Sequence, residues 1–201
     1  MLAKIIISNQ WVAVFLLAVM WSSSTQAELT FVDGGYSELC SNAAFRAELA
    51  ERIVITGSRL GLQPVDVCTL ATNTPDSSQS SVSGSYNNRG VLLFAQKDFP
   101  AALADFDMAI ELEPESGLLY INRGYTLTAM QRWQESIAAY ITSIELAAPE
   151  LDKAYFNRGI AHEELGNIKQ AYLDYKKAAE LNPVWEEPLA ELRRFSVQKP
   201  N

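Results

Sequence analysis

Tyr86-Asn87-Asn88-Arg89-Gly90 is one of three near-copies of a single pentapeptide in this chain of 201 residues. The other two are Tyr120-Ile121-Asn122-Arg123-Gly124 and Tyr155-Phe156-Asn157-Arg158-Gly159, so the glycines are 34 and then 35 residues apart. A small residue follows each glycine twelve positions on, and an aromatic residue follows it sixteen positions on: Ala102 and Phe106, Ser136 and Tyr140, Ala171 and Tyr175. A fixed period near 34 indicates an array of stacked structural units.

Each unit has the pattern of two short helices. In residues 83–116, apolar residues recur at helical spacing in two runs, and Lys97-Asp98-Phe99-Pro100 separates the runs. Pro100 suits the first turn of the second helix, and Pro114 ends that helix. Two such helices cannot bury both of their apolar stripes alone, so neighbouring units have to stack. Gly90 is small because two helices meet closely there.

This pattern resembles the tetratricopeptide repeat, whose signature is an aromatic residue, a glycine four positions on, and then alanine, an aromatic residue, alanine and proline. The second unit departs from it with Ser136 and Ser143 in place of alanines, and with one extra residue in Ala147-Ala148. In the third unit His162 stands where a bulky residue is usual. The resemblance implies an all-α, right-handed solenoid of three helix-turn-helix repeats, at residues 83–116, 117–150 and 151–185. We expect residues 186–197 to form a C-terminal capping helix, as solenoids require.

The resemblance also implies a ligand-binding groove. Positions of the first helix just before and after the glycine face the concave side in such arrays, and here they include Asn88, Val91, Phe94, Ile121, Asn122, Tyr125, Phe156, Asn157 and Ile160. We expect the three asparagines to hold the backbone of an extended peptide, because one carboxamide can donate to a peptide C=O and accept from its N–H. The alternative is that each asparagine bonds to the neighbouring repeat.

The arginines of the three pentapeptides have a structural interpretation. Arg89 and Arg158 can reach Asp105 and Asp174, which occupy equivalent places in the second helix of their units. Arg123 has Ala139 at that place instead.

The two-carboxylate clamp of chaperone-binding relatives is not reproduced in this chain. Only Lys153 and two of the asparagines resemble parts of that clamp, and Asn87 and Val91 stand where a lysine and an asparagine would be needed. An acidic C-terminal peptide is therefore not the expected ligand.

Residues 1–27 have the features of a secretory signal peptide. Lys4 supplies the positive end, Trp11–Trp21 is apolar, and Thr25-Gln26-Ala27 offers a cleavage site before Glu28. The alternative is a membrane anchor through an uncleaved signal, but Ser8-Asn9-Gln10 leaves a continuous run about half as long as the roughly 20 residues of a membrane span. We predict cleavage, no membrane insertion afterwards, and a periplasmic or secreted protein.

Cys40 and Cys68 are the two cysteines of the chain, and an even count in an exported protein suggests a disulfide bond. Such a bond would stabilise the fold by about 3.6 kcal/mol. The alternative is a pair of buried free thiols, and a Cys–Cys metal site is not expected because His162 is far away in sequence. We expect residues 28–72 to form a disulfide-tied helical hairpin and residues 73–82 to form a polar linker.

The composition and the absence of catalytic motifs limit the classes of function that this chain can have. The net charge of −8 argues against nucleic acid and anionic lipid as partners. The chain has no serine-triad order, no nucleophile elbow, no phosphate loop and no metal-ligand cluster, so we predict no enzyme activity and no cofactor. The prediction is a non-catalytic module that binds a protein or peptide; the alternative is a scaffold subunit of an envelope complex that uses its convex surface. The residues identify neither the partner nor the oligomeric state.

Overall fold

The computed structural model describes residues 37, 40–41, 63–74 and 77–197. The chain divides into two units, Met1–Val32 and Asp33–Asn201, and every described residue belongs to the second. The predicted signal peptide, residues 1–27, and most of the predicted hairpin lie outside the described residues.

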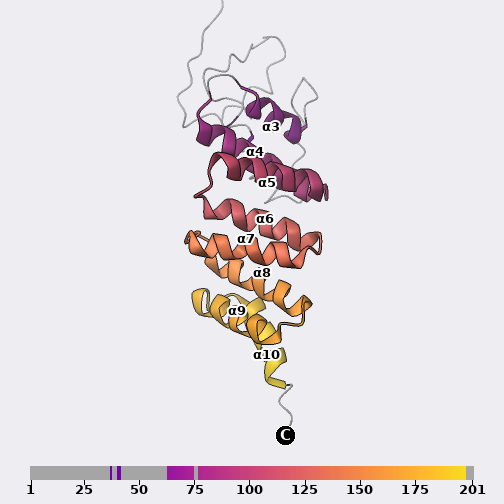
Figure 1. Cartoon of the computed structure of the whole chain (residues 1–201), viewed down its shortest axis with the longest axis vertical. Helices are drawn as coiled ribbons and strands as arrows, with labels where there is room; N and C mark the ends of the chain where they lie inside the picture. The colour runs from indigo at the N-terminus through magenta and orange to yellow at the C-terminus, as the bar shows by residue number, and fades with distance from the viewer. Residues whose placement is uncertain (1–36, 38–39, 42–62, 75–76, 198–201) are drawn as a thin grey trace, which may run out of the picture. The chain divides into compact units, whose positions relative to one another are not determined.

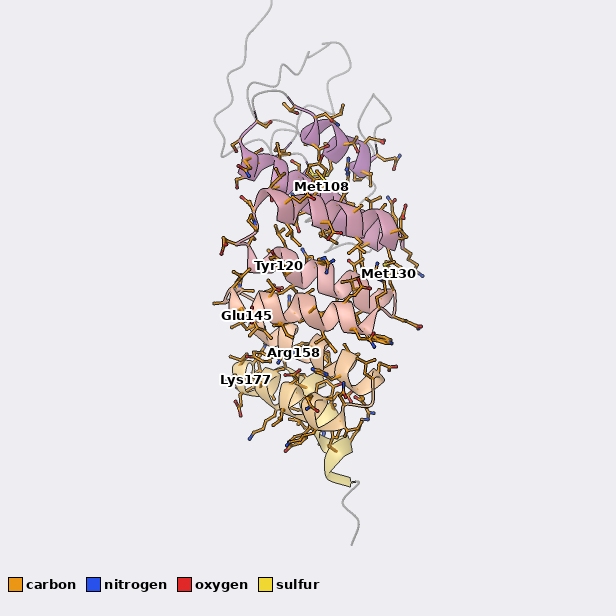
Figure 2. The ribbon with its side chains drawn as sticks, viewed as in Figure 1. Met108, Tyr120, Met130, Glu145, Arg158 and Lys177 are labelled. Carbon is orange, nitrogen blue, oxygen red and sulfur yellow. A yellow bond between two sulfur atoms is a disulfide. The ribbon has the colours of Figure 1, made fainter. Side chains whose placement is uncertain are left out.

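All regular structure in the described part of the chain is helical, which confirms the predicted all-α fold class. Ser37, Cys40 and Ser41 are helical, and eight helices follow in the order shown in Figure 1: α3 (Pro64–Thr72), α4 (Gln79–Ala95), α5 (Phe99–Leu112), α6 (Gly117–Ala129), α7 (Trp133–Glu145), α8 (Leu151–Glu164), α9 (Ile168–Leu181) and α10 (Glu186–Val197). The repeats are the pairs α4–α5, α6–α7 and α8–α9, and each helix packs on the next along the chain. Side chains fill the space between successive ribbons (Figure 2).

The repeated sequence pattern corresponds to one contact that recurs in every repeat. In each repeat the pentapeptide glycine packs against the aromatic ring that follows it by sixteen residues. A Cβ atom would lie 2.8 Å from the ring of Phe106 if added to Gly90, and 2.7 Å from the ring of Tyr140 if added to Gly124. At Gly159 the same distance, to the ring of Tyr175, is 2.7 Å. All three rings are buried, so glycine is required wherever the ring is kept.

The turn between the helices of a repeat is also the same each time. Lys97, Gln131 and Gly166 have φ angles of 65°, 58° and 74°, so each takes the left-handed conformation that L-residues rarely adopt. The next N–H bonds back to a carbonyl five residues earlier, which is the Schellman arrangement at a helix end. Asp98 then begins α5 by accepting from the N–H of Ala101, and Pro100 lies in the first turn as predicted.

The extra residue of the second repeat is absorbed at the end of α7. Ala147 has a φ angle of 49°, and the N–H of Ala148 bonds to the carbonyl of Ser143 at 3.1 Å. Gly117 permits this turn, because a Cβ atom there would lie 2.9 Å from the Cβ atom of Ala148.

The N-terminal element packs on the first repeat. In the structure Cys40 and Cys68 are bonded to each other with their Cα atoms 4.7 Å apart, and both are fully buried. They form a small core with Ala71 of α3 and Leu92 of α4. Cys40 and Cys68 thus connect the N-terminal element to the first repeat through this small core.

One boundary differs from the prediction. Helix α4 begins at Gln79, inside the segment 73–82 that was expected to be a polar linker. Ser78 caps the helix by accepting from the N–H of Ser81, and the Gln79 side chain donates to the Leu112 carbonyl at 2.6 Å. These polar residues therefore satisfy backbone groups at helix ends, which is why a polar composition did not mark a loop here.

The C-terminal cap has the predicted bounds, because α10 spans Glu186–Val197. Pro188 is buried, and the Phe195 ring lies 5.8 Å from Tyr172 and 6.0 Å from Tyr175 of α9. The apolar side of α10 therefore covers part of the last repeat.

Candidate binding face

The predicted groove residues lie on the first helices of the repeats, α4, α6 and α8. Three rows of equivalent positions run across these helices: the asparagines Asn88, Asn122 and Asn157; the apolar residues Val91, Tyr125 and Ile160; and the residues Phe94, Thr128 and Glu163. We call this surface the first-helix face. Tyr125 is its most exposed apolar member, at 48%, whereas Val91, Phe94 and Ile160 are half-buried.

Ile121 does not belong to this face, and its prediction as a groove residue was wrong. It is only 5% exposed and packs in a core cluster with Tyr140, Ala148 and Ala154. Its position points toward the contact between the second and third repeats. An apolar residue at that place, where the first unit has Asn87, was the available signal that it serves packing.

The asparagines bond within the protein. Asn122 Nδ2 donates to Asn87 Oδ1 at 2.7 Å, which links the second repeat to the first. Asn87 Nδ2 lies 3.4 Å from Asn88 Oδ1, and Asn88 Nδ2 donates to Ser41 Oγ at 3.0 Å. Asn157 instead donates to the Lys153 carbonyl of its own helix. A carboxamide has two N–H groups and a carbonyl oxygen, so these bonds use only part of each side chain.

An aromatic pair joins the first two repeats. The ring centroids of Phe94 and Tyr125 lie 5.1 Å apart, and Phe94 also lies 5.2 Å from Phe99 at the start of α5. Phe156 occupies a different environment, because its ring packs on Trp185 at 4.7 Å and on Tyr175 at 5.5 Å. Phe156 therefore supports the segment before α10, whereas Tyr125 presents its ring to solvent.

In the row of Phe94, Thr128 and Glu163, the side chain is polar where the buried ring of the same repeat carries a hydroxyl group. Phe94 accompanies Phe106, which has no hydroxyl group, whereas Thr128 lies 3.3 Å from the hydroxyl oxygen of Tyr140. Glu163 accepts from the hydroxyl of Tyr175 at 2.8 Å. Burial raises the pKa of both tyrosines well above the usual value.

Glu163 has a second partner, which fixes the cap. Arg194 Nη2 of α10 donates to Glu163 Oε1 at 2.8 Å. Thr128 and Glu163 occupy equivalent positions of the first-helix face, and their contacts give both a structural role.

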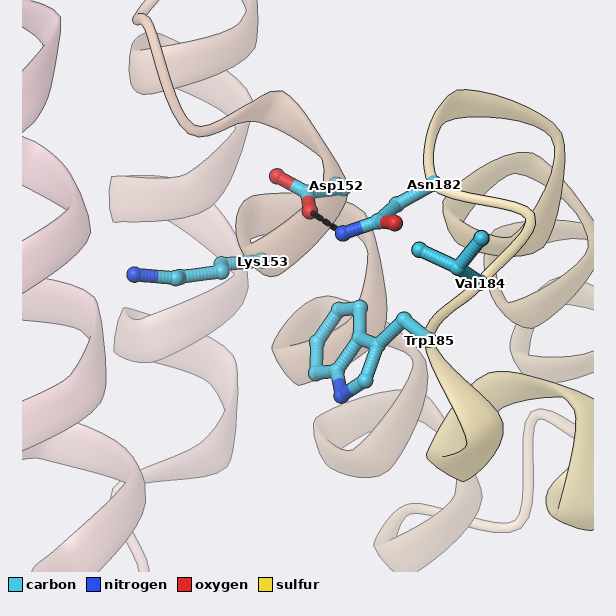
Figure 3. A pocket seen from close by; sticks show the side chains of 5 residues that line it. All are labelled: Asp152, Lys153, Asn182, Val184 and Trp185. Carbon is cyan, nitrogen blue, oxygen red and sulfur yellow. Dashed lines mark hydrogen bonds between the residues drawn. The ribbon is translucent and has the colours of Figure 1, made fainter.

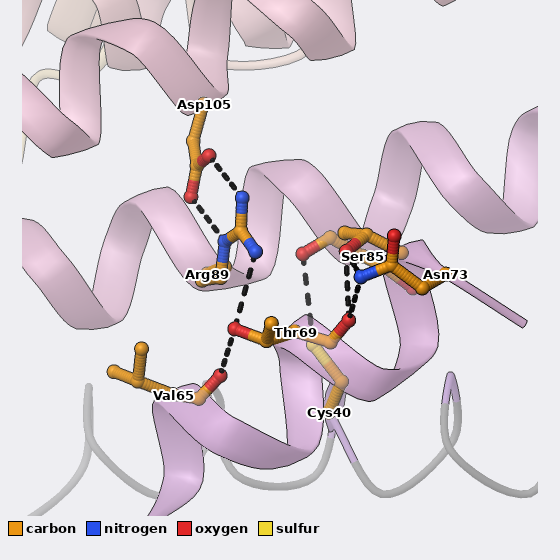
Figure 4. Close-up of polar contacts among 8 residues, drawn as sticks. Cys40, Val65, Thr69, Asn73, Ser85, Arg89 and Asp105 are labelled. Atoms are coloured by element: carbon orange, nitrogen blue, oxygen red, sulfur yellow. Dashed lines mark hydrogen bonds and ion pairs between the residues drawn. The ribbon is translucent and has the colours of Figure 1, made fainter.

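Two arginines of the pentapeptides, Arg89 and Arg158, form the predicted pairs. Arg89 binds Asp105 through Nε and Nη2 at 2.8 and 2.7 Å, and Arg158 binds Asp174 in the same way. Figure 4 shows that Arg89 also donates to Thr69 Oγ1 of α3, at 3.1 Å, so one guanidinium joins three helices. The hydrogen bond to Asp105 raises the pKa of Arg89.

Arg123, which lacks an aspartate in its own repeat, bonds to Asp107 of the preceding one at 2.7 Å. All three pentapeptide guanidinium groups are thus paired with carboxylates of the chain. The arrangement holds helices together and does not present these cations to a ligand.

A hollow of about 400 Å³ adjoins the first-helix face at the third repeat. Figure 3 shows its lining: Asp152, Lys153, Asn182, Val184 and Trp185. Asn182 Nδ2 donates to Asp152 Oδ2 at 2.9 Å, which connects the start of α8 to the end of α9. Asp152 and Lys153 belong to α8, and Asn182, Val184 and Trp185 belong to the segment between α9 and α10.

His162 is half-buried on α8, and burial lowers its pKa. Within the described ranges no three His, Cys, Asp or Glu side chains are grouped to hold a metal ion. None of the helices described is both long and apolar enough to cross a membrane.

Comparison with protein families finds a match to the tetratricopeptide repeat at residues 84–116 and 152–183. These stretches correspond to the first and third repeats. The second repeat, with its two serines and its extra residue, lies outside the matched ranges.

The chain is also similar to several named proteins. It is 31% identical over 98 residues to the STIP1 homolog of Dictyostelium discoideum. The aligned region covers 49% of this chain and 17% of that protein. It is 28% identical over 133 residues to the tetratricopeptide repeat protein 36 homolog of Drosophila pseudoobscura pseudoobscura, covering 64% of this chain and 71% of that protein. The chain therefore spans a small part of the first relative and most of the second.

Solved structures with the same fold include the Arabidopsis OM64 TPR domain, with a TM-score of 0.58 and 22% identity over 61% of this chain and 100% of that one. Another is the first TPR of Spaghetti (RPAP3) bound to the HSP90 peptide SRMEEVD, with a TM-score of 0.56 and 24% identity over 58% of this chain and 92% of that one. These likenesses confirm the tetratricopeptide-type solenoid.

Proposed function

We propose that this tetratricopeptide-repeat chain is a non-catalytic binding module that holds an extended segment of a partner protein along its first-helix face. The observation that carries the proposal is the aromatic pair of Phe94 and Tyr125. Tyr125 is 48% exposed although its ring contacts Phe94 across a repeat boundary. A rigid aromatic side chain held at the surface by a neighbour is the kind of residue that dominates binding energies.

The similarity of fold to solved peptide-bound domains supports the proposal but does not identify the ligand of this chain. The first TPR of Spaghetti (RPAP3) is bound to the HSP90 peptide SRMEEVD, and the second TPR of human RPAP3 is in complex with the HSP70 peptide SGPTIEEVD. The present chain shares that architecture but uses its pentapeptide arginines in internal ion pairs. We therefore propose a peptide ligand of a different chemistry.

The proposed setting is the periplasm or another exported location. The predicted signal peptide, residues 1–27, motivates this part of the proposal. Its support in the fold is the bonded pair Cys40 and Cys68, because disulfides persist in oxidising compartments.

The test is a selection of random twelve-residue peptides on the purified, disulfide-containing chain, followed by calorimetry with the selected peptides. Tyr125→Ala should weaken binding on the order of tenfold or more, which is the loss of an aromatic anchor worth about 2 kcal/mol. Ile141→Ala is the matched control, because Ile141 is an apolar residue of α7 with 41% exposure. Equal affinities of the two variants would exclude the first-helix face, and urea unfolding of both would confirm that each is folded.

A scaffold role is the second candidate, and one surface favours it. Ile168, Tyr172 and Leu173 of α9 are exposed apolar residues, each more than two-fifths accessible. A subunit docking there would tolerate Tyr125→Ala and lose its partner with Leu173→Ser. Co-purification of the exported partner with each variant distinguishes the two functions.

A further inference from the structure

We propose that the exposed side of α9 is a second docking surface, which takes an acidic amphipathic helix of a partner protein. This surface lies on a different helix from the first-helix face, so docking there does not depend on the proposed peptide site. The scaffold role described above would use the same surface. We call it the α9 patch, and its members are Ile168, Lys169, Tyr172, Leu173, Lys176 and Lys177.

The α9 patch consists of two rows along one side of the helix. In each row the members are four residues apart: Ile168, Tyr172 and Lys176 in one, and Lys169, Leu173 and Lys177 in the other. Side chains at that spacing are neighbours on a helix surface. All members of both rows are exposed, whereas the buried residues of α9 are Ala171, Asp174, Tyr175 and Ala178. The two rows therefore form a continuous strip that faces away from the core.

Leu173 is larger than the fold requires at its position. The equivalent residues are Ala104 of α5 and Ala138 of α7, and this position is exposed in all three repeats. A methyl group is thus sufficient for stacking, and Leu173, at 52% exposure, adds apolar surface that the solenoid does not need. Exposed apolar residues that lie together mark interaction surfaces more often than single ones do.

Tyr172 and Ile168 extend this apolar surface toward α10. The equivalent of Tyr172 in the first repeat is Leu103, which is buried in a cluster with Leu127 of α6. Phe195 of α10 contacts the Tyr172 ring, with the centroids 5.8 Å apart, yet Tyr172 stays exposed. Ile168 and Phe195 also line a hollow of about 90 Å³. Helix α10 therefore covers only part of the apolar strip and leaves a recess at its edge.

The α9 patch is positively charged, although the chain as a whole carries a net charge of −8. The acidic residues of α9 are Asp174, which is buried in an ion pair, and Glu180. Lys176 and Lys177 share the carboxylate of Glu180, at 3.9 and 3.6 Å. Together with Lys169, three ammonium groups thus face one exposed carboxylate of their helix. Helices α5 and α7 contain no lysine or arginine, so this charge distinguishes the third repeat and favours an acidic partner.

A helix is the partner element that fits such a strip. Residues four apart form ridges, and the ridges of a second helix pack between them with the axes about 8–10 Å apart. A helix also satisfies its own backbone hydrogen bonds, which suits a surface of apolar side chains and ammonium groups. Apolar side chains of the partner would cover Tyr172 and Leu173, and its carboxylates would meet the lysines beside them.

The experiment titrates three eighteen-residue peptides into the full, disulfide-containing chain and follows the backbone amide signals of the protein by NMR. The first peptide has leucine at every third or fourth residue and glutamate on both flanks of that stripe. The second replaces the glutamates with lysine, and the third replaces the leucines with glutamine. We expect the first to bind on the order of tenfold more tightly than the others, with shifts on α9 and none on α4 or α6. Its affinity should fall several-fold between about 0.05 and 0.5 M NaCl.

Variants test the two components of the surface separately. Leu173→Ala should weaken the first peptide on the order of tenfold, and it places at this position the residue that the other two repeats already have. Ile141→Ala, a change at an exposed apolar residue of α7, is the matched control and should leave binding unchanged. Lys169→Glu/Lys177→Glu should lose the first peptide and gain the second, a reversal that a loss of folding cannot produce. Tyr125→Ala should have no effect here, which separates this surface from the proposed peptide site.

Four results would overturn the inference. Equal binding of the first and second peptides would reject the charge preference, and equal binding of the first and third would reject the apolar one. Equal losses in Leu173→Ala and Ile141→Ala would exclude this surface. Absence of shifts with all three peptides would reject the partner class, and binding of phosphatidylglycerol vesicles that depends on Leu173 would then assign the α9 patch to a membrane surface.

Discussion

Arg123 donates to Asp107 across the boundary between the first and second repeats, with Nε and Oδ1 2.7 Å apart. The equivalent arginines, Arg89 and Arg158, bind aspartates of their own repeats. The difference arises because Ala139 occupies the place of the aspartate in the second repeat. The repeat with alanine at this position therefore has an inter-repeat ion pair where the other two have an intra-repeat one.

Arg158→Ala should destabilise the fold far more than Arg123→Ala. Asp174 has a side chain only 7% exposed, so removing its partner leaves a buried carboxylate, at a cost of about 3 kcal/mol. Asp107 is 48% exposed and can be hydrated, so its pair is worth less than about 1 kcal/mol. Urea unfolding measures both, and equal losses would contradict the difference in burial.

Gly124→Ala and Gly84→Ala should have opposite effects. A Cβ atom on Gly124 would lie 2.7 Å from the ring of Tyr140, whereas nothing lies within 4 Å of one on Gly84. We expect a loss of about 1–3 kcal/mol at Gly124 from overpacking. At Gly84 we expect a gain of about 0.5–1 kcal/mol, because alanine restricts the unfolded chain and favours a helix. Thermal unfolding of the two variants tests the register of the repeats, which would be wrong if Gly124→Ala kept full stability.

Loss of the disulfide should lower stability and disturb the N-terminal end of the first-helix face. Cys40 and Cys68 are 28 residues apart, which corresponds to about 3.6 kcal/mol by chain entropy. The Cys40→Ala/Cys68→Ala variant should unfold at lower urea, and it should release Ser41 from Asn88. Thiol labelling of the unfolded, unreduced wild type should find no free thiol, and two reactive thiols would exclude the bond.

Stability should fall in alkali. The folded-state pKa values of Tyr140 and Tyr175 are raised above the reference of 10.0 by burial. The folded state therefore holds these protons more tightly, so the contribution is complete below about pH 10 and is lost as pH rises beyond it. The Tyr140→Phe/Tyr175→Phe variant should show a flatter decline in unfolding free energy above pH 10. An unchanged slope would show that neither hydroxyl is responsible.

N-terminal sequencing of the exported protein should begin near Glu28. The motivation is Lys4, the apolar run Trp11–Trp21 and the small residues of Thr25-Gln26-Ala27. Recovery of Met1 on a membrane-integrated product would instead establish an anchored protein.

The sequence by itself determined the repeat, its register and much of its chemistry. Contacts within a repeat join residues at constant separation, so the repeated pattern alone predicted that two helices meet closely at Gly90 and that Arg158 can reach Asp174. The closing helix at 186–197 followed instead from the need of a solenoid for a terminal cap.

Only the tertiary structure decided the contacts between repeats. Asn122 bonds to Asn87, and Ile121 packs in the core, because of how neighbouring repeats are oriented against each other. Sequence separations within one repeat do not specify that orientation. The hollow beside Trp185 likewise depends on where the segment between α9 and α10 lies against the start of α8. Packing between units is set by the summed shapes of many side chains, and this is why the asparagines, identical in sequence, differ in their partners.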